Sequence, residues 1–288
     1  MARKNIISLI FALIFLNQFQ ATAQQEINFH HESTDTARIT EILVAESAQP
    51  QPGSLTRIAE HFIGKPYEGG TLDGDETEIL RVNIDTFDCT TFVETVLALA
   101  YTAAEHRQSW HDFVYNLRHF RYRNGDTDGY ASRLHYVSDW IIDNSARGLL
   151  HEVTAASPKV RYGVKSLDYM TTHRESYPAL TDDENFRAMK HVEAGYSNHR
   201  FPYLKGSGLK GKHIAEIARD GDIIIFTTSI RGLDATHMGI IKLDNDGEPR
   251  LIHASSNAGK VVIDELPVAD YIAKHRSDGI RIIRMKLD

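Results

Sequence analysis

The spacing of hydrophobic residues divides this chain into a helical part and a strand-rich C-terminal part. Apolar side chains recur every three or four positions in segments that we expect to be helices, at 34–48, 54–63, 109–120, 134–144 and 182–191. A further helix should begin near Cys89, where Phe92, Val96 and Leu99 form one apolar stripe. Apolar residues also flank that stripe, so this helix is predicted to lie inside the domain core.

After Asp220 the pattern changes to short, nearly continuous apolar runs typical of buried strands. They occupy 222–228, 236–243, 250–254, 260–266 and 279–287, with a short helix expected at 268–275. Helices followed by consecutive strands predict an α+β fold with an antiparallel sheet of about five strands. The segment 105–212 is mixed in character and is predicted to be a large insertion.

The first 23 residues read as a cleaved signal peptide. Arg3 and Lys4 precede a short apolar run, which ends in the A-x-A pattern at Ala21-Thr22-Ala23. The run is shorter than the ~20 residues that a membrane-spanning helix needs. We therefore expect an exported periplasmic protein without a stable membrane anchor, and a single domain over 24–288.

Charge argues against a nucleic-acid partner. The chain carries a net charge of −7, which becomes −9 when Arg3 and Lys4 are removed with the leader. Proteins that bind nucleic acids present basic surfaces to the phosphates, and this sequence contains no large basic cluster.

The single cysteine lies in Phe87-Asp88-Cys89-Thr90-Thr91, just ahead of the buried helix. A lone cysteine is either a small buried hydrophobe or a reactive thiol. Asp88 is well suited to cap the helix, which would place Cys89 in the first turn, where the helix dipole favours a thiolate. Unpaired backbone N–H groups of that turn are suited to bind an oxyanion.

Two histidines in the strand region are predicted to lie on one face of a hairpin. The turn Asp244-Asn245-Asp246-Gly247 joins two strands, and folding about Asn245 sets His237 opposite His253. Three interpretations remain open for the pair. They are ligands of a metal, although a closed zinc site needs four; they are ordinary histidines; or they complete a Cys-His-His triad with Cys89.

Four segments in this order resemble the landmarks of NlpC-type bacterial cell-wall cysteine amidases. They are G-K-P-Y-E-G-G at 64–70, F-D-C-T-T-F at 87–92, T-H-M-G-I at 236–240 and L-I-H-A-S at 251–255. The D-C-T-T sequence, the long gap before the first histidine, and S-R-L-H-Y at 132–136 are similar to one branch of that superfamily. That branch comprises N-acetylmuramoyl-L-alanine amidases that act on soluble muropeptides.

The resemblance implies a papain-like core, with the cysteine at a helix N-terminus packed on the antiparallel sheet. It implies hydrolysis of the amide between N-acetylmuramic acid and L-alanine in peptidoglycan fragments, with no cofactor and no metal. Cys89 would then be the nucleophile, His237 the base and His253 the residue that orients it, with Tyr67 beside the cysteine. Asp88, Thr90 and Thr91 would contact the substrate.

The 105–212 insertion is where we expect specificity for the sugar. Tyr130, Arg133 and Tyr136 are the predicted contacts, because aromatic rings and Arg side chains suit an acetamido sugar. Trp140 is better explained as a core residue. We interpret Asp126–Gly129 as a turn, since it lacks the final Glu of a calcium loop, and His30-His31 as a mobile N-terminal segment.

Other functions remain open from the sequence alone. A γ-D-glutamyl–diaminopimelate endopeptidase would keep the same fold and cut a different bond, and an acyltransferase would share the nucleophile. A peptidoglycan-binding module without catalysis would leave Cys89 dispensable. Analysis of the reaction products separates these alternatives.

Overall fold

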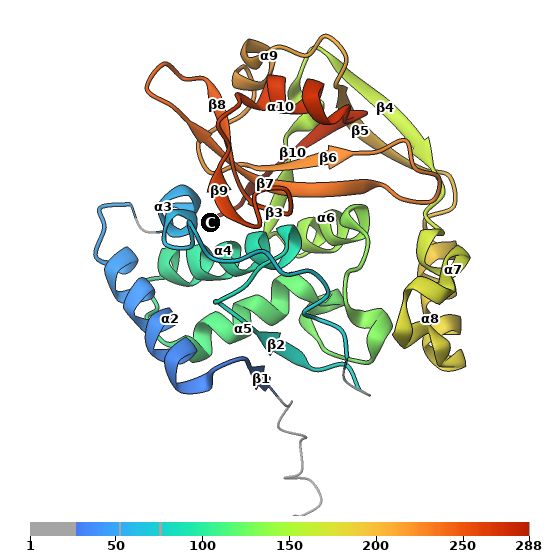
Figure 1. Cartoon of the computed structure of the whole chain (residues 1–288), viewed down its shortest axis with the longest axis horizontal. Coiled ribbons are helices and arrows are strands. Elements are labelled where there is room, and N and C mark those ends of the chain that lie inside the picture. Colours follow the sequence, from blue (N-terminus) through green and yellow to red (C-terminus); the bar gives the residue numbers. More distant parts are fainter. Residues whose placement is uncertain (1–26, 52, 75–76, 288) are drawn as a thin grey trace, which may run out of the picture.

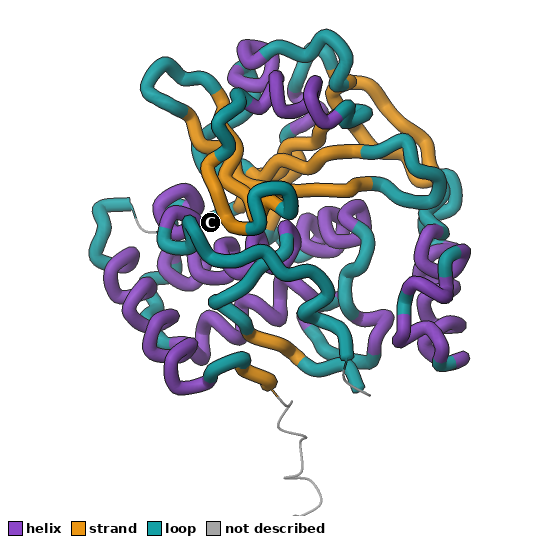
Figure 2. Tube along the Cα trace, in the orientation of Figure 1, coloured by secondary structure: helices purple, strands orange, loops and turns teal. Residues whose placement is uncertain are grey.

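The computed structural model describes residues 27–51, 53–74 and 77–287. The predicted signal peptide lies outside the described residues. Figure 1 shows a layer of helices that includes α2, α4 and α5 on one side of a large sheet, with α9 and α10 on the other side. Figure 2 shows the same division, with most strands gathered in one half and most helices in the other. The fold is therefore mixed α/β with a large antiparallel sheet.

The predicted helices are confirmed within a few residues of their expected bounds. The α-helices are α2 (Glu32–Ser47), α3 (Leu55–Glu60), α4 (Cys89–Ala104), α5 (Trp110–Arg121), α6 (Val137–Ala146), α7 (Tyr169–Thr172), α8 (Asp183–Ala194), α9 (Gly211–Ala215) and α10 (Val268–His275). Side chains cap several of them as expected: Ser54 accepts a hydrogen bond from the Arg57 N–H, and Asp182 caps α8.

The strands form two sheets. They are β1 (Ile27–Phe29), β2 (Leu80–Val82), β3 (Leu150–Glu152), β4 (Val160–Lys165), β5 (His199–Lys205), β6 (Ile223–Thr227), β7 (Ala235–Leu243), β8 (Pro249–Ser255), β9 (Lys260–Ile263) and β10 (Gly279–Met285). Strands β1 and β2 pair in parallel as a small sheet. The main sheet has the order β4-β5-β10-β6-β7-β8-β9, and β3 also pairs with β10.

The predicted count of about five strands is too low, because within the described ranges the main sheet has eight. The three additional strands, β3, β4 and β5, come from the 105–212 segment, which therefore extends the sheet. Strand β4 lies at the sheet edge and is mostly exposed, so it carries no continuous apolar run by which sequence could identify it.

Alternate residues of the central strands pack on opposite faces of the sheet. Ile223, Ile225 and Ile240 belong to the core that contains α4, whereas Ile224 and Ile241 belong to the core that contains α10. A strand buried on both faces is expected to be apolar at nearly every position, which explains the nearly continuous apolar run within 222–228.

Helix α4 is the most deeply buried helix, with most of its residues fully inaccessible to solvent. Glu94 lies within it and accepts a hydrogen bond from Nε of Arg121 at 2.6 Å. Both side chains are 3% exposed. This buried ion pair ties α4 to the C-terminal end of α5.

Among the described residues, no helix is both long and apolar enough to span a membrane. The N-terminal segment with His30 and His31 was predicted to be mobile, but in the structure it is hydrogen-bonded to β2. His30 donates its N–H to the Val82 carbonyl at 2.9 Å, which extends the pairing of β1 with β2.

Candidate active site

The β7–β8 hairpin brings His237 and His253 together on the sheet face that α10 covers. Its register differs from the expected one by two residues: Ile241 pairs with Leu251 and Ile240 with Ile252, which, when continued, sets Gly239 opposite His253. The physical reason is that the turn is centred on Asp246: the Asp244 N–H donates to the Glu248 carbonyl, and Gly247, with φ +77°, donates its N–H to the Asp244 carbonyl. A shift of two residues keeps both histidines on one face, because side chains alternate with a period of two.

The two imidazoles are joined directly. Nε2 of His237 lies 2.6 Å from Nδ1 of His253. On the far side of His253, Nε2 lies 3.4 Å from Oδ2 of Asp264. His253 is only 1% exposed, so its ring is held in place between these two partners. The sequence did not reveal the role of Asp264, since it follows a strand end with no distinguishing pattern.

Gly239 has no side chain, and this lets β7 and β8 approach closely beside the His237–His253 pair. A Cβ atom built on Gly239 would lie 2.8 Å from the Ile252 carbonyl oxygen and 3.0 Å from Cβ of His253. Real Cβ atoms do not approach backbone oxygen so closely, so a larger residue would separate the two strands next to the histidines.

We therefore expect Gly239→Ala to lower the free energy of unfolding by about 1–3 kcal/mol, the usual range for overpacking a core. Activity should fall as well, because the His237–His253 contact would open. Urea unfolding and steady-state kinetics measure both effects. Gly247→Ala in the exposed turn is the comparison, since its effect should be confined to stability. Wild-type stability and activity in Gly239→Ala would contradict the packing described here.

Helix α10 packs against the His237–His253 pair. The ring of Tyr271 lies 5.4 Å from that of His253 and 6.3 Å from that of His237, and the His275 ring lies 4.2 Å from that of Tyr271 at a tilt of 31°. A cavity of about 230 Å³ opens here. It is lined by Phe226, Thr236, His237, His253, Ser255, Ser256, Asn257, Tyr271, His275 and Ser277.

Cys89 is the first residue of α4, and a capping box holds this helix start. The Asp88 carboxylate accepts the Thr91 N–H at 2.7 Å, and the Thr91 hydroxyl oxygen accepts the Asp88 N–H at 3.0 Å. The thiol lies close to the backbone of Met238. Cys89 is therefore next to the residue that follows His237 in β7.

The electrostatics of the site favour a neutral thiol at rest, which differs from the expected thiolate. Burial and the neighbouring Asp88 carboxylate raise the pKa of Cys89 to about 11. Burial, together with His253 and His275, lowers the pKa of His237 to about 3. Desolvation and a like-signed neighbour outweigh the helix dipole, so Cys89 is a neutral thiol and His237 a neutral imidazole near pH 7, and among the described residues no hydrogen bond joins the two side chains.

A direct measurement is the rate at which iodoacetamide alkylates the protein, because Cys89 is its only cysteine. Only the thiolate reacts, so a pKa raised to about 11 predicts a rate that keeps rising beyond pH 9, by about tenfold per pH unit. Alkylation of free cysteine provides the comparison, since it levels off above its own pKa of ~8.5. A plateau at or below pH 8 would show that Cys89 is a resting thiolate.

The other predicted residues near the cysteine occupy different positions. Burial and the charges of Cys89 and Asp88 raise the pKa of Tyr67, a half-buried residue whose backbone pairs with Phe87, two residues before the cysteine. Thr90 Oγ1 lies 4.0 Å from the sulfur. Thr91 is 5% exposed and its hydroxyl is used by the cap, so contact with a substrate would require the cap to open.

The three residues predicted to contact sugar are engaged inside the protein. Arg133 binds Asp73 at 2.6 Å and lies over the ring of Tyr130, and both are 7% exposed. Tyr136 is 1% exposed and its hydroxyl donates to Glu193 at 2.7 Å. These contacts explain the residues structurally, and a sugar contact remains a prediction for them. Trp140 is a core residue, as expected.

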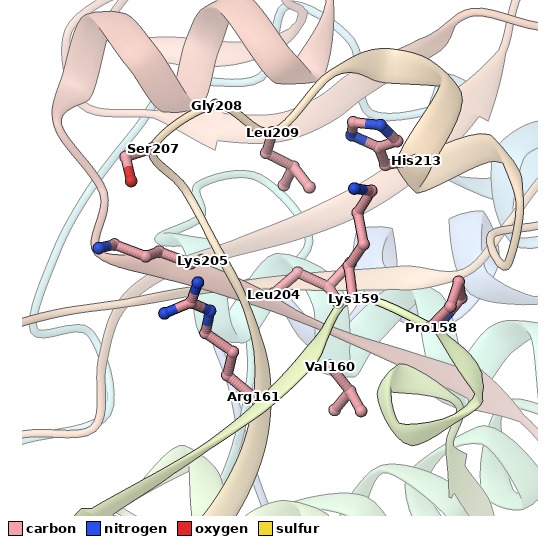
Figure 3. Close-up of a pocket in the computed structure, with 10 residues that line it drawn as sticks. All are labelled: Pro158, Lys159, Val160, Arg161, Leu204, Lys205, Ser207, Gly208, Leu209 and His213. Atoms are coloured by element: carbon pink, nitrogen blue, oxygen red, sulfur yellow. The ribbon is translucent and has the colours of Figure 1, made fainter.

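A separate basic pocket of about 400 Å³ contains none of the predicted site residues. Figure 3 shows Lys159 and Arg161 at the start of β4, Lys205 at the end of β5, and His213 on α9 around it. Because β4 is the edge of the main sheet, its cations are explained by the need to prevent pairing with another strand.

Comparison with known proteins points to one family. A family model described as AmiA-like, N-acetylmuramoyl-L-alanine amidase-like, matches residues 57–280. A solved structure of an N-acetylmuramoyl-L-alanine amidase from Bacteroides uniformis ATCC 8492 is 37% identical, with a TM-score of 0.75. The match covers 82% of this chain and 100% of that one. No curated protein sequence matches the chain.

A structure from Bacteroides fragilis is also similar and carries a different name. It is provisionally named a xylanase, is 42% identical, and aligns over 80% of this chain and 100% of its own, with a TM-score of 0.72. A second structure of the Bacteroides uniformis amidase is 38% identical over 81% of this chain and 98% of its own, again with a TM-score of 0.75.

Proposed function

The chain belongs to the AmiA-like, N-acetylmuramoyl-L-alanine amidase-like family, and from this we propose that it is a cysteine-dependent amidase that releases stem peptides from muropeptides. The family supports a hydrolase acting on peptidoglycan. The observation that carries the finer proposal is the short contact between His237 and His253. Met238, the residue after His237 in β7, lies close to the Cys89 thiol. We further propose that α4 and the sheet correspond to a papain-like core of the NlpC type.

The proposed reaction uses His237 as the base. Because Nε2 of His237 is held by His253, its Nδ1 is the nitrogen left to take the thiol proton. The sulfur attacks the lactyl carbonyl carbon of N-acetylmuramic acid, and the carbonyl becomes an oxyanion. His237 then gives the proton to the L-alanine nitrogen as the C–N bond breaks, which leaves a thioester.

Water completes the cycle. His237 accepts a proton from water as the water oxygen attacks the thioester, and the sulfur leaves and is reprotonated. His253 keeps the base in one tautomer, and the Asp264 carboxylate, 3.4 Å from Nε2 of His253, favours a proton on that nitrogen. A neutral resting pair fits this scheme, since the thiolate forms only during attack. The N–H of Cys89 and the Tyr67 hydroxyl are the proposed oxyanion donors.

We propose a periplasmic location because of the signal-peptide pattern at residues 1–23. An exported enzyme of this kind would meet peptidoglycan fragments where they are formed. Cell fractionation tests this part independently of the chemistry: the protein should appear in the osmotic-shock fraction with its first residue near Gln24.

Mass analysis of products tests the reaction itself. Incubation with a disaccharide–peptide muropeptide should yield the intact disaccharide and the intact stem peptide, with no cleavage of the glycan. A disaccharide that still carries a dipeptide would identify a γ-D-glutamyl endopeptidase instead. Split sugars would identify a glycosidase, which ordinarily needs a pair of carboxylates that Cys89, His237 and His253 do not supply.

A further inference from the structure

Two adjacent histidines and an aspartate meet where the chain passes from β1 into α2. One ring nitrogen each from His30 and His31 and one carboxylate oxygen of Asp85 all lie within 4.8 Å of one another. Nδ1 of His31 and Oδ2 of Asp85 are 3.2 Å apart. The cluster is separate from the proposed catalytic residues.

The backbone gathers these side chains in a way that a regular strand would not. Neighbouring residues of a strand point to opposite faces. Here the strand ends at Phe29 and helix α2 begins at Glu32, and at the corner the two imidazoles lie 4.1 Å apart in an edge-to-face arrangement. His31 occupies the N-cap position, yet its side chain makes no capping hydrogen bond, so the ring is turned towards Asp85.

The two oxygens of Asp85 have different partners. Oδ1 accepts a hydrogen bond from Nζ of Lys65 at 2.7 Å, whereas Oδ2 faces His31. The Asp85 N–H donates to Oδ1 of Asn83, which fixes the backbone of the aspartate. A carboxylate that binds a metal ion in a protein is commonly also hydrogen-bonded to a neighbouring group, which fixes its orientation. Asp85 has this arrangement, with Oδ1 bound to Lys65 and Oδ2 facing the histidines.

We propose that His30, His31 and Asp85 bind a divalent transition metal ion, with Zn²⁺ as the ion that this ligand set suits best. Two imidazoles and one carboxylate are ordinary zinc ligands, with bonds of ~2.0–2.2 Å in tetrahedral geometry. Such bonds set ligand atoms a little over ~3 Å apart, and the His31–Asp85 separation already has this value. Three protein ligands leave a fourth position for water.

A simple ion pair between His31 and Asp85 is the competing explanation. It accounts for two of the three residues and gives no reason for the ring of His30 to lie against that of His31. His30 is therefore the residue that distinguishes the two explanations. The two histidines precede the family-matched region 57–280, whereas Asp85 lies within it, so the site would join the N-terminal segment to the matched region.

Metal binding would connect this segment to the loop that presents the cysteine. Asp85 is followed by Thr86, whose hydroxyl donates to Glu68 beside Tyr67, and then by Phe87 and the Asp88 cap. An ion held by His30, His31 and Asp85 would connect the start of α2 to the loop that runs from Asp85 to Asp88. Through the Thr86–Glu68 hydrogen bond it would also connect to the segment that carries Tyr67. Because it binds only the folded chain, it would raise the melting temperature.

Titration of the purified protein with Zn²⁺, without a histidine tag, tests the proposal by calorimetry and by thermal melting. We expect one ion per chain and a rise in melting temperature. His30→Ala, His31→Ala and Asp85→Asn should each weaken binding at least tenfold and remove the rise. Co²⁺ should give the visible absorption of a four-coordinate site in the wild type and in the control, but in none of these three variants. His191→Ala, on an exposed face of α8, is the matched control.

The outcome for His30→Ala decides between the explanations. Unchanged Zn²⁺ affinity in a folded His30→Ala protein, as judged by circular dichroism, would overturn the site. A wild-type protein that takes up no Zn²⁺ would also overturn it, as would an equal loss of binding in His191→Ala. These readouts do not depend on amidase activity, so the result for the metal site neither supports nor contradicts the proposed reaction.

Discussion

Replacing Cys89 with alanine is expected to lower the rate of amide cleavage by at least roughly a thousandfold, with substrate binding retained. The sulfur is the only atom in the site that can form the proposed thioester, and loss of a nucleophile removes most of the rate enhancement in enzymes of this type. Turnover of a muropeptide followed by mass spectrometry measures the loss.

The structure supplies the controls for this variant. Cys89 is half-buried at a helix start whose cap is made by Asp88 and Thr91, so the variant should fold normally. Alkylation of the wild type should remove activity in proportion to labelling, while the same reagent should not alter Cys89→Ala. A folded variant that retains a tenth of wild-type activity would exclude Cys89 as the nucleophile.

The largest effect on stability is expected for Glu94→Gln in α4. Removing this charge leaves the Arg121 guanidinium buried without its counterion, although Nη1 still donates to the Arg81 carbonyl. Breaking a buried pair in this way costs about 3–5 kcal/mol of folding free energy, while the substitution preserves the side-chain volume. Urea unfolding should show a lower midpoint with an unchanged slope.

An exposed pair of the same type provides the comparison. Glu41 binds Arg38 within α2 at 2.7 Å, and both side chains are well exposed. Glu41→Gln should change the unfolding free energy by less than about 1 kcal/mol, because water screens the pair. Equal effects at positions 41 and 94 would show that burial of the Glu94–Arg121 pair does not determine its contribution.

Much of the site could be predicted from sequence because its determinants are local. A capping aspartate ahead of an apolar helical run fixes Cys89 at the start of α4. Strand periodicity and a glycine-containing turn set His237 and His253 on one face, even though the hairpin is centred on Asp246 and not on Asn245 as predicted. An error of two residues in register was tolerated, whereas an error of one would have separated the pair.

Other features were decided only by long-range packing. The histidine–Asp264 contact, the ring of Tyr271 over the pair and the meeting of His30 and His31 with Asp85 each join segments whose spacing carries no pattern. The same holds for β4 and β5, whose mixed polar and apolar residues give no continuous apolar run. Burial of Tyr136 against Glu193 likewise arises from the packing of α8.

The amino-acid sequence by itself predicted which residues would carry the proposed chemistry: one cysteine at a helix start and two histidines on adjacent strands. Only the tertiary structure decided their charge states. The helix dipole, visible in the sequence, favours a thiolate, but burial and Asp88 raise the pKa of Cys89 to about 11. Desolvation depends on everything packed around a group, and no local pattern encodes that environment.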